Sequence, residues 1–102
     1  IDTSDERHRL EKYQGTIKNY LFEDKGLYEL FDKDNNLIES YEGDFKHGKR
    51  HGRGFYKNIH EKYEYEGEFL NDVMHGNGKL THSTGTLEGM FLDGLFVGAE
   101  HE

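Results

Sequence analysis

One short sequence pattern constrains the fold more than any other feature. It is a glycine with one apolar residue two places before it and another two places after it. It reads YEGDF at 41–45, YEGEF at 65–69 and LEGMF at 87–91, so successive copies begin 24 and 22 residues apart. A weaker copy, YQGTI at 13–17, begins 28 residues before the first of these. This spacing is typical of an array in which one small structural unit is stacked several times.

Alternation within each copy predicts a β-strand, because the aromatic residues and the glycine fall on one face and the acidic residues on the other. Further glycines follow nine and eleven residues after the first, as Gly52 and Gly54 in one copy and Gly76 and Gly78 in the next. They indicate a second strand whose bare backbone leaves room for an aromatic ring from a neighbouring strand. Each unit is therefore expected to be a β-hairpin around a glycine-containing turn, stabilised by stacking of Tyr and Phe between hairpins.

The predicted fold is all-β: a single-layer, twisted antiparallel sheet of three to four successive β-hairpins. The segments outside the repeat, residues 1–12 and 100–102, are expected to form an N-terminal tail, flexible or briefly helical, and a short C-terminal tail. The expected units are a degenerate copy at 13–40, two clear copies at 41–64 and 65–86, and an incomplete copy without a second strand at 87–99.

The run Tyr-Glu-Gly-Asp-Phe-x-x-Gly-x-x-x-Gly-x-Gly at 41–54, followed by YEGEF at 65–69, resembles the MORN (membrane occupation and recognition nexus) repeat. The likeness covers about residues 13–99 and is strongest in 41–78. It implies an elongated, twisted antiparallel sheet of hairpins. It also implies attachment or scaffolding beside membranes, the cytoskeleton or cilia, sometimes as a module joined to a kinase or methyltransferase domain. A family resemblance indicates a class of role and not a particular partner.

Composition argues against several classes of function. Thirteen Lys and Arg against 21 Asp and Glu give a net charge of -8, which disfavours general nucleic-acid binding because counterion release needs a basic face. The absence of cysteine rules out disulfides and thiolate metal sites and fits a reducing compartment. No apolar run approaches the length of a membrane span. We expect a cytoplasmic protein, peripheral at a membrane or at the cytoskeleton.

We expect no catalysis, no cofactor and no bound metal. The seven histidines do not form the convergent set of three or four ligands that zinc bound by imidazoles alone would need. None of the three serines has a His–Asp pair near it in the sequence, and a thin sheet offers no deep pocket in which to desolvate an acid or base. GKRHGRG at 48–54 lacks the Gly-Lys-Ser/Thr ending of a phosphate loop, so its glycines are interpreted as structural.

Two surfaces are candidates for binding a partner. The first is the apolar face, where a groove rimmed by Glu and Lys is expected to hold a protein segment, either a strand or an amphipathic helix. The predicted contacts there are Tyr41, Phe45, Tyr56, Tyr65, Phe69 and Phe91. The alternative for these rings is that they only pack on one another. The second surface is the basic turn, a candidate for a phosphoinositide or another anionic phospholipid, or else simply a solvated turn. Its predicted contacts are Lys46, Lys49, Arg50 and Arg53.

The ends of the array suggest two further interpretations. Leu92, Leu95, Phe96 and Val97 gather where no second strand is expected, and an open apolar edge favours pairing with a second copy. This predicts a homodimer through residues 87–98. The sequence begins with Ile and not Met, so the array is also compatible with a regulatory appendage of an enzyme that lies outside it.

Overall fold

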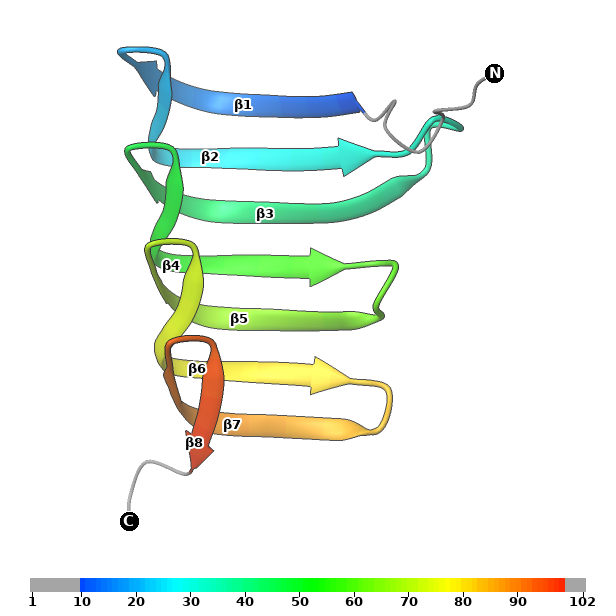
Figure 1. Cartoon of the computed structure of the whole chain (residues 1–102), viewed down its shortest axis with the longest axis vertical. Coiled ribbons are helices and arrows are strands. Elements are labelled where there is room, and N and C mark those ends of the chain that lie inside the picture. Colours follow the sequence, from blue (N-terminus) through cyan, green and yellow to red (C-terminus); the bar gives the residue numbers. More distant parts are fainter. Residues whose placement is uncertain (1–9, 99–102) are drawn as a thin grey trace.

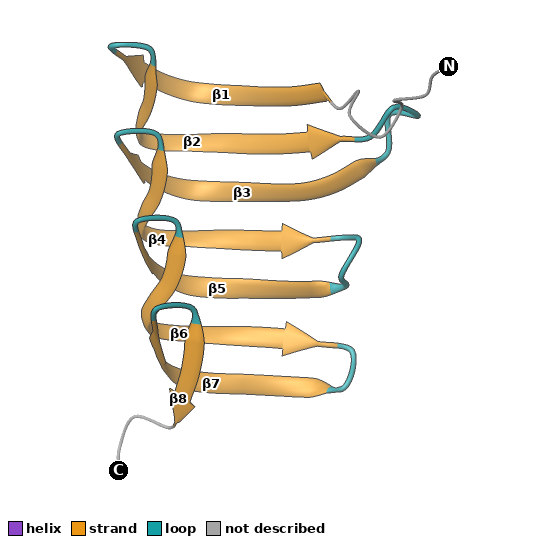
Figure 2. Cartoon of the chain, viewed as in Figure 1, coloured by secondary structure: helices purple, strands orange, loops and turns teal. Residues whose placement is uncertain are grey.

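The computed structural model describes residues 10–98 as a single open sheet of eight antiparallel strands (Figures 1 and 2). Each strand pairs with its neighbours in chain order, from β1 at one edge to β8 at the other, and the described residues form no helix. The strands are β1 (Leu10–Lys18), β2 (Leu21–Phe31), β3 (Leu37–Lys46), β4 (Lys49–Asn58), β5 (Tyr63–Leu70), β6 (Val73–His82), β7 (Gly85–Leu92) and β8 (Leu95–Gly98). The predicted fold class, an all-β array of successive hairpins, is confirmed.

Two-residue turns close the four hairpins at one end of the sheet. Both residues of each turn have positive φ, the signature of a type I′ turn, which suits the right-handed twist of the flanking strands. The turn residues are Asn19 and Tyr20, His47 and Gly48, Asn71 and Asp72, and Asp93 and Gly94. Two of these turns contain no glycine, which corrects the expectation of a glycine in every turn. Asn and Asp tolerate positive φ because their short polar side chains can bond the local backbone.

A row of glycines crosses the sheet from β1 to β7, each paired with the next across neighbouring strands. Its members are Gly15, Gly26, Gly43, Gly54, Gly67, Gly78 and Gly89. A Cβ added to Gly54 would lie less than 3.0 Å from the ring of Tyr41. The Tyr41 hydroxyl donates to the backbone oxygen of Asp44 at 2.8 Å, which holds the ring over this bare backbone. The second glycine of the pair Gly52 and Gly54 therefore leaves room for an aromatic ring, as expected.

The glycines nine residues after the first of each unit do something else: they bend the chain. Gly52 and Gly76 have φ of 73° and 91°, and Asp24 holds the same place in the first hairpin with φ of 58°. The hydrogen-bonded ladder is irregular at Gly52. Between the pairs Gly43–Gly54 and Phe45–Arg50, the three residues 51–53 of β4 lie opposite the single residue Asp44 of β3. Such bulges bend strands and raise their twist. The expectation that Gly52 makes space on the apolar face is corrected accordingly.

From the second hairpin on, the bend folds each turn onto the preceding hairpin, as the overlapping curled ends show in Figure 1. Turn amides then donate to backbone oxygens of the earlier unit: Gly48 to Phe22 at 2.9 Å, Asp72 to Arg50 at 3.0 Å, and Gly94 to Met74 at 2.8 Å. Because the same bond recurs between successive hairpins, it sets how each hairpin stacks on the one before it.

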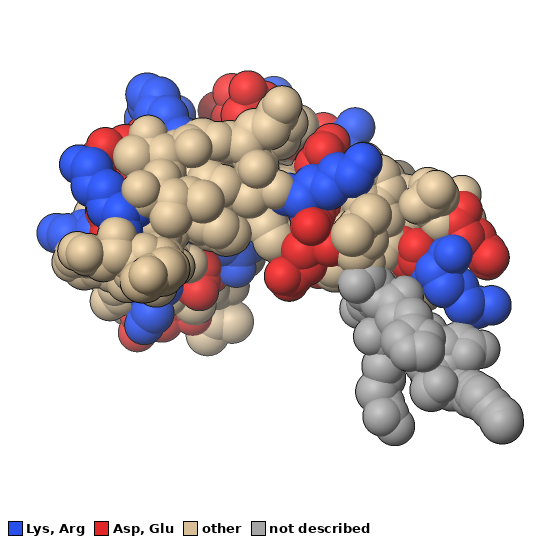
Figure 3. All heavy atoms as spheres, turned by 90° about the horizontal axis from the view of Figure 1, so that it is seen from above, with Lys and Arg blue, Asp and Glu red and all other residues tan. Residues whose placement is uncertain are grey.

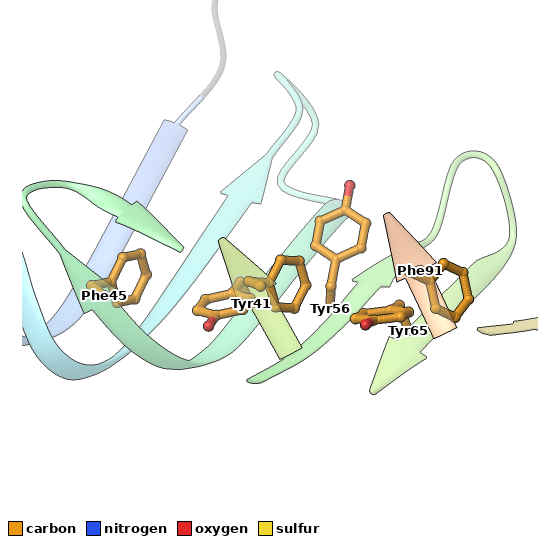
Figure 4. Packing of buried hydrophobic residues seen from close by; sticks show 6 residues of the cluster. Tyr41, Phe45, Tyr56, Tyr65 and Phe91 are labelled. Atoms are coloured by element: carbon orange, nitrogen blue, oxygen red, sulfur yellow. The ribbon is translucent and has the colours of Figure 1, made fainter. Parts of the chain in front are cut away.

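The core lies between the sheet and the folded-over turns. Its cluster of buried residues consists of Tyr41, Phe45, Tyr56, Tyr65, Phe69 and Phe91. Five of these rings form an edge-to-face series in the order Phe45, Tyr41, Phe69, Tyr65 and Phe91, with neighbouring centroids 5.0 to 5.1 Å apart. Figure 4 shows the labelled rings following one another along the array. Each such pair contributes about 0.5–1.5 kcal/mol beyond the area it buries, so this series ties successive hairpins together.

Two predicted boundaries differ from the structure. Residues 10–12, expected in the N-terminal tail, belong to β1, because they pair in register with the end of β2. The last unit, expected to lack a second strand, has the short strand β8, because Asp93 and Gly94 form the same turn as in the earlier hairpins. The rest of the expected tails, residues 1–9 and 99–102, lies outside the described residues.

Candidate partner-binding site

The six aromatic residues predicted to contact a partner form the protein's own core. Tyr41, Tyr65 and Phe91 are at most 1% exposed, and the other three are at most 8% exposed. They are covered because the turns fold over the face that the alternation pattern indicated as open. In this structure they pack on one another, which is the alternative that the sequence left open. Three of them, Tyr41, Phe45 and Tyr56, also line a pocket on this face, and contact with a partner stays a prediction.

A pocket of about 310 Å³ remains open on this face, between strands β1 to β4 and the turn at 47–48. Aromatic rings, carboxylates and one guanidinium line it. This N-terminal pocket consists of Glu11, Phe22, Tyr28, Glu39, Tyr41, Phe45, Gly48, Arg50, Tyr56 and Asp72. Phe22 and Tyr28 are only partly buried, unlike the six core residues. Apolar surface is thus accessible to a partner here.

Two hydrogen bonds between tyrosine and glutamate shape the pocket wall. Tyr28 donates its hydroxyl to Glu11 Oε2 at 2.9 Å, and Tyr56 donates to Glu39 Oε1 at 3.1 Å. Figure 4 shows the Tyr56 hydroxyl pointing the opposite way from the hydroxyl of the neighbouring Tyr41. Burial raises the pKa of both Tyr28 and Tyr56, and the adjacent carboxylates raise it further. Both hydroxyls therefore stay protonated at neutral pH and hold the two glutamate side chains in place as acceptors.

Arg50 places a cation against the aromatic face. Its guanidinium carbon lies 5.0 Å from the centre of the Tyr56 ring and 5.2 Å from that of Phe69. It also donates to Asp72, from Nε to Oδ1 at 3.2 Å and from Nη2 to the backbone oxygen at 2.7 Å. Through these contacts, Arg50 joins the turn at 71–72 to the preceding hairpin.

The basic residues of the predicted anion-binding turn do not share one surface. Lys46 and Lys49 are exposed and pair across the base of the turn, whereas Arg50 lies against the aromatic face. Arg53 lines the outer face of the sheet, 3.9 Å from Glu68. Figure 3 shows Lys and Arg interspersed with Asp and Glu on the face seen from above. The four predicted contacts therefore do not converge on a single anion.

Glu11 and Glu39 were not among the residues singled out by the sequence patterns. Glu11 falls in the expected tail and Glu39 in a variable connection between units. A repeat offset links them, since each lies two residues before the tyrosine that opens a unit, Tyr13 or Tyr41. Tyr63 holds this offset in the third unit, so the carboxylate is a property of the first two hairpins only.

The outer edge of the sheet is the place of the predicted self-association. Within residues 10–98, β8 pairs only with β7, and its Leu95 and Val97 are 69% and 60% exposed. Pairing of two copies through residues 87–98 stays a prediction.

Within residues 10–98, no three His, Asp or Glu side chains gather as a metal site requires. The described residues also include no helix that is long and apolar enough to cross a membrane.

Comparison with known proteins gives one family. The family model of the MORN repeat matches residues 41–57 and 65–87, which cover most of the β3–β4 hairpin, most of β5, all of β6 and the start of β7. A search of curated proteins found no significant match. MORN repeats are non-catalytic modules that are generally associated with interaction with proteins or membranes. Residues 41–57 and 65–87 are thus similar to MORN repeats, and the eight-stranded hairpin array is consistent with an array of such repeats.

Proposed function

We propose that this chain is a non-catalytic interaction module that docks a segment of a partner protein in the N-terminal pocket. The observation that supports this most is the pocket itself, about 310 Å³ in volume, where the partly exposed rings of Phe22 and Tyr28 lie beside buried ones. Partly apolar concave sites with a few fixed polar groups are the usual form of a binding site.

The partner binds through side chains and not by adding a strand to the middle of the sheet. Strands β2 to β7 already have a hydrogen-bonded neighbour on both sides. A pocket of this volume has room for one or two side chains, so a single anchor residue enters it while the flanking segment lies along the surface.

We extend the proposal to a scaffolding role in the cytoplasm, next to a membrane or the cytoskeleton. Its support is that MORN repeats are generally associated with interaction with proteins or membranes. Contact with anionic lipid through the basic turn has less support. Among the described residues, Lys46 and Lys49 alone of these four basic side chains make no ion pair, because Arg50 is bound to Asp72 and Arg53 lies on the outer face near Glu68.

Site-specific photo-crosslinking tests this proposal. A benzoylphenylalanine is placed either at Tyr28 in the pocket or at Leu27, its neighbour on β2, which lines the outer face. In extracts of the cells that make the protein, we expect a discrete cross-linked partner from position 28 and none from position 27. Equal cross-linking from both positions, or cross-linking from position 27 alone, would contradict the proposal.

Vesicles that contain phosphatidylserine separate the lipid alternative from docking of a protein segment. If the basic turn is the functional surface, Lys46→Ala/Lys49→Ala should reduce co-sedimentation with the vesicles, and no partner should be captured from position 28. If the pocket is the functional surface, the same double variant should leave cross-linking from position 28 unchanged.

A further inference from the structure

We propose that the N-terminal pocket takes a cation, namely the guanidinium or ammonium group of an arginine or lysine in the partner segment. This inference rests on the proposed function and adds the chemistry by which the pocket recognises its partner.

The aromatic rings of the pocket offer faces that attract a cation. Phe22 and Tyr28 have centroids 6.4 Å apart and planes tilted by 48°, so they form adjoining walls and not a closed stack. The negative face of an aromatic ring attracts a cation that lies within about 6 Å of its centre. An apolar anchor would also fit these walls, so the charge of the pocket decides between the two.

The charge of the pocket favours a cation. Three carboxylates (Glu11, Glu39 and Asp72) and one guanidinium (Arg50) line it, which gives a formal net charge of -2. Asp72 is bound to Arg50. Glu11 and Glu39 each use one oxygen to accept a tyrosine hydroxyl, and within residues 10–98 the other oxygen of each makes no hydrogen bond.

The two glutamates are placed to flank a long side chain. Glu11, Leu30 and Glu39 are cross-strand neighbours on β1, β2 and β3. The carboxylates thus lie on either side of the buried Leu30, with backbones two strand spacings apart, about 10 Å. A side chain that enters over β2 meets the ring of Tyr28 and a carboxylate on each side. An arginine, with five donors in a planar fork, or a lysine, with three, can satisfy such acceptors.

The second hairpin already contains the arrangement that we propose for the first. Phe22 and Arg50 hold equivalent places, because each gives its backbone oxygen to the following turn. Arg50 of the second hairpin supplies the cation over Tyr56, and Asp72 of the following turn supplies the carboxylate. In the first hairpin, Phe22 supplies no cation, and no other cation of residues 10–98 bonds Glu11 or Glu39, so the rings and glutamates can accept one from a partner.

Nuclear magnetic resonance titration of the whole chain tests this inference. The probe is the capped peptide Gly-Ser-Arg-Ser-Arg-Ser-Gly, and its neutral counterpart carries citrulline in place of both arginines. We expect the arginine peptide to shift the backbone amide signals of Tyr28, Leu30 and Glu39, and the citrulline peptide to shift them far less. Equal shifts with both peptides would overturn the inference, because citrulline keeps the shape and loses the charge.

Two double variants with the same change in net charge provide the matched control. Glu11→Gln/Glu39→Gln removes both charges from the pocket but keeps acceptors for the tyrosine hydroxyls, so the fold should be retained, and thermal unfolding checks this. Glu42→Gln/Glu66→Gln removes two charges from the outer face. We expect the pocket variant to weaken binding of the arginine peptide about tenfold, and the control variant to weaken it less than about twofold. Equal weakening by both would show that only the overall negative charge attracts the peptide.

Failure of this inference can be told apart from failure of the proposed function. If position 28 captures a partner while the two peptides bind alike, the pocket docks a segment but does not select a cation. If position 28 captures nothing and neither peptide shifts the pocket signals, both proposals are rejected.

Discussion

Replacing one glycine of the transverse row by alanine should destabilise the protein through a tyrosine on another strand. Gly54→Ala is the most informative case, because the φ of Gly54 lies outside the left-handed region and the backbone itself accepts alanine. The new Cβ, however, would lie less than 3.0 Å from three atoms at the far end of the Tyr41 ring. The ring must move to admit it.

The expected loss follows from the contacts of that ring. Tyr41 is 1% exposed, packs edge-to-face on Phe45 and Phe69 at 5.0 and 5.1 Å, and donates its hydroxyl to Asp44 at 2.8 Å. Overpacking costs about 1–3 kcal/mol and an unpaired buried polar group about 1–3 kcal/mol. Alanine is itself favoured over glycine in a strand by about 0.5–1 kcal/mol. The free energy of unfolding should therefore fall by about 3 kcal/mol, or roughly 12–24 °C in Tm.

A double-mutant cycle isolates the clash, with urea unfolding followed by circular dichroism. Tyr41→Leu removes the ring atoms that the Cβ meets, and Leu87 holds the same place in the last unit. In the Tyr41→Leu background, Gly54→Ala should cost less than about 1 kcal/mol, so the coupling energy should be about 2 kcal/mol or more. An equal cost in both backgrounds would refute the proposed link between the glycine row and the tyrosine rings.

Three other predictions concern the bend, acid stability and self-association. Because Gly52 has φ of 73°, Gly52→Asn should lower Tm far less than Gly52→Val, and equal losses would mean that the bend does not depend on backbone conformation. Burial raises the pKa of Asp44, but the hydrogen bonds that it accepts from Lys25 and from the Arg53 amide outweigh burial and leave that pKa below its usual value. The stability that Asp44 contributes should therefore be present above about pH 4 and be lost as the pH falls below it; urea unfolding from pH 5 to 2.5 should show a smaller decline in Asp44→Asn than in the unmodified protein. Light scattering at high micromolar concentration should give a dimer that Leu95→Lys converts to a monomer, and a monomeric mass for the unmodified protein would exclude pairing through residues 87–98.

The hairpins and their order could be predicted from the sequence because the information for them is local. Alternation of apolar and acidic residues defines the first strand of each unit, and the repeat period places every hairpin next to the one that follows it. Even the degenerate first unit follows the backbone pattern of the later units. Asp24, which replaces the glycine found at that place in the later units, adopts the same positive φ as they do.

The burial of the aromatic face could not be predicted, because it depends on which of two roles a glycine takes. Gly52 and Gly54 look alike in the sequence, yet Gly52 bends the strand while Gly54 makes room for Tyr41. Alternation alone treats the strand as straight and therefore leaves its apolar face open. The bend in one hairpin brings the turn of that hairpin over the apolar face of the hairpin before it. The rings predicted to contact a partner are thereby buried.

The N-terminal pocket escaped prediction for a related reason. Glu11 and Glu39 become neighbours only across β2, and their effect depends on the difference between Phe22 and Arg50 at one repeated place. In the sequence alone, the residue differences between repeat copies at one place do not show which side chains they bring together. Once the register of the strands is known, the same differences mark where one hairpin departs from the others.

A nitroxide attached to the arginine peptide gives the most direct measurement of where this protein binds a partner segment. Paramagnetic broadening should be strongest for the amide signals of Phe22, Tyr28 and Glu39 in the N-terminal pocket, and weakest for those of β7 and β8 at the other end of the array. Broadening that is strongest on β7 and β8, or on the exposed Lys46 and Lys49 of the basic turn, would contradict docking in the pocket.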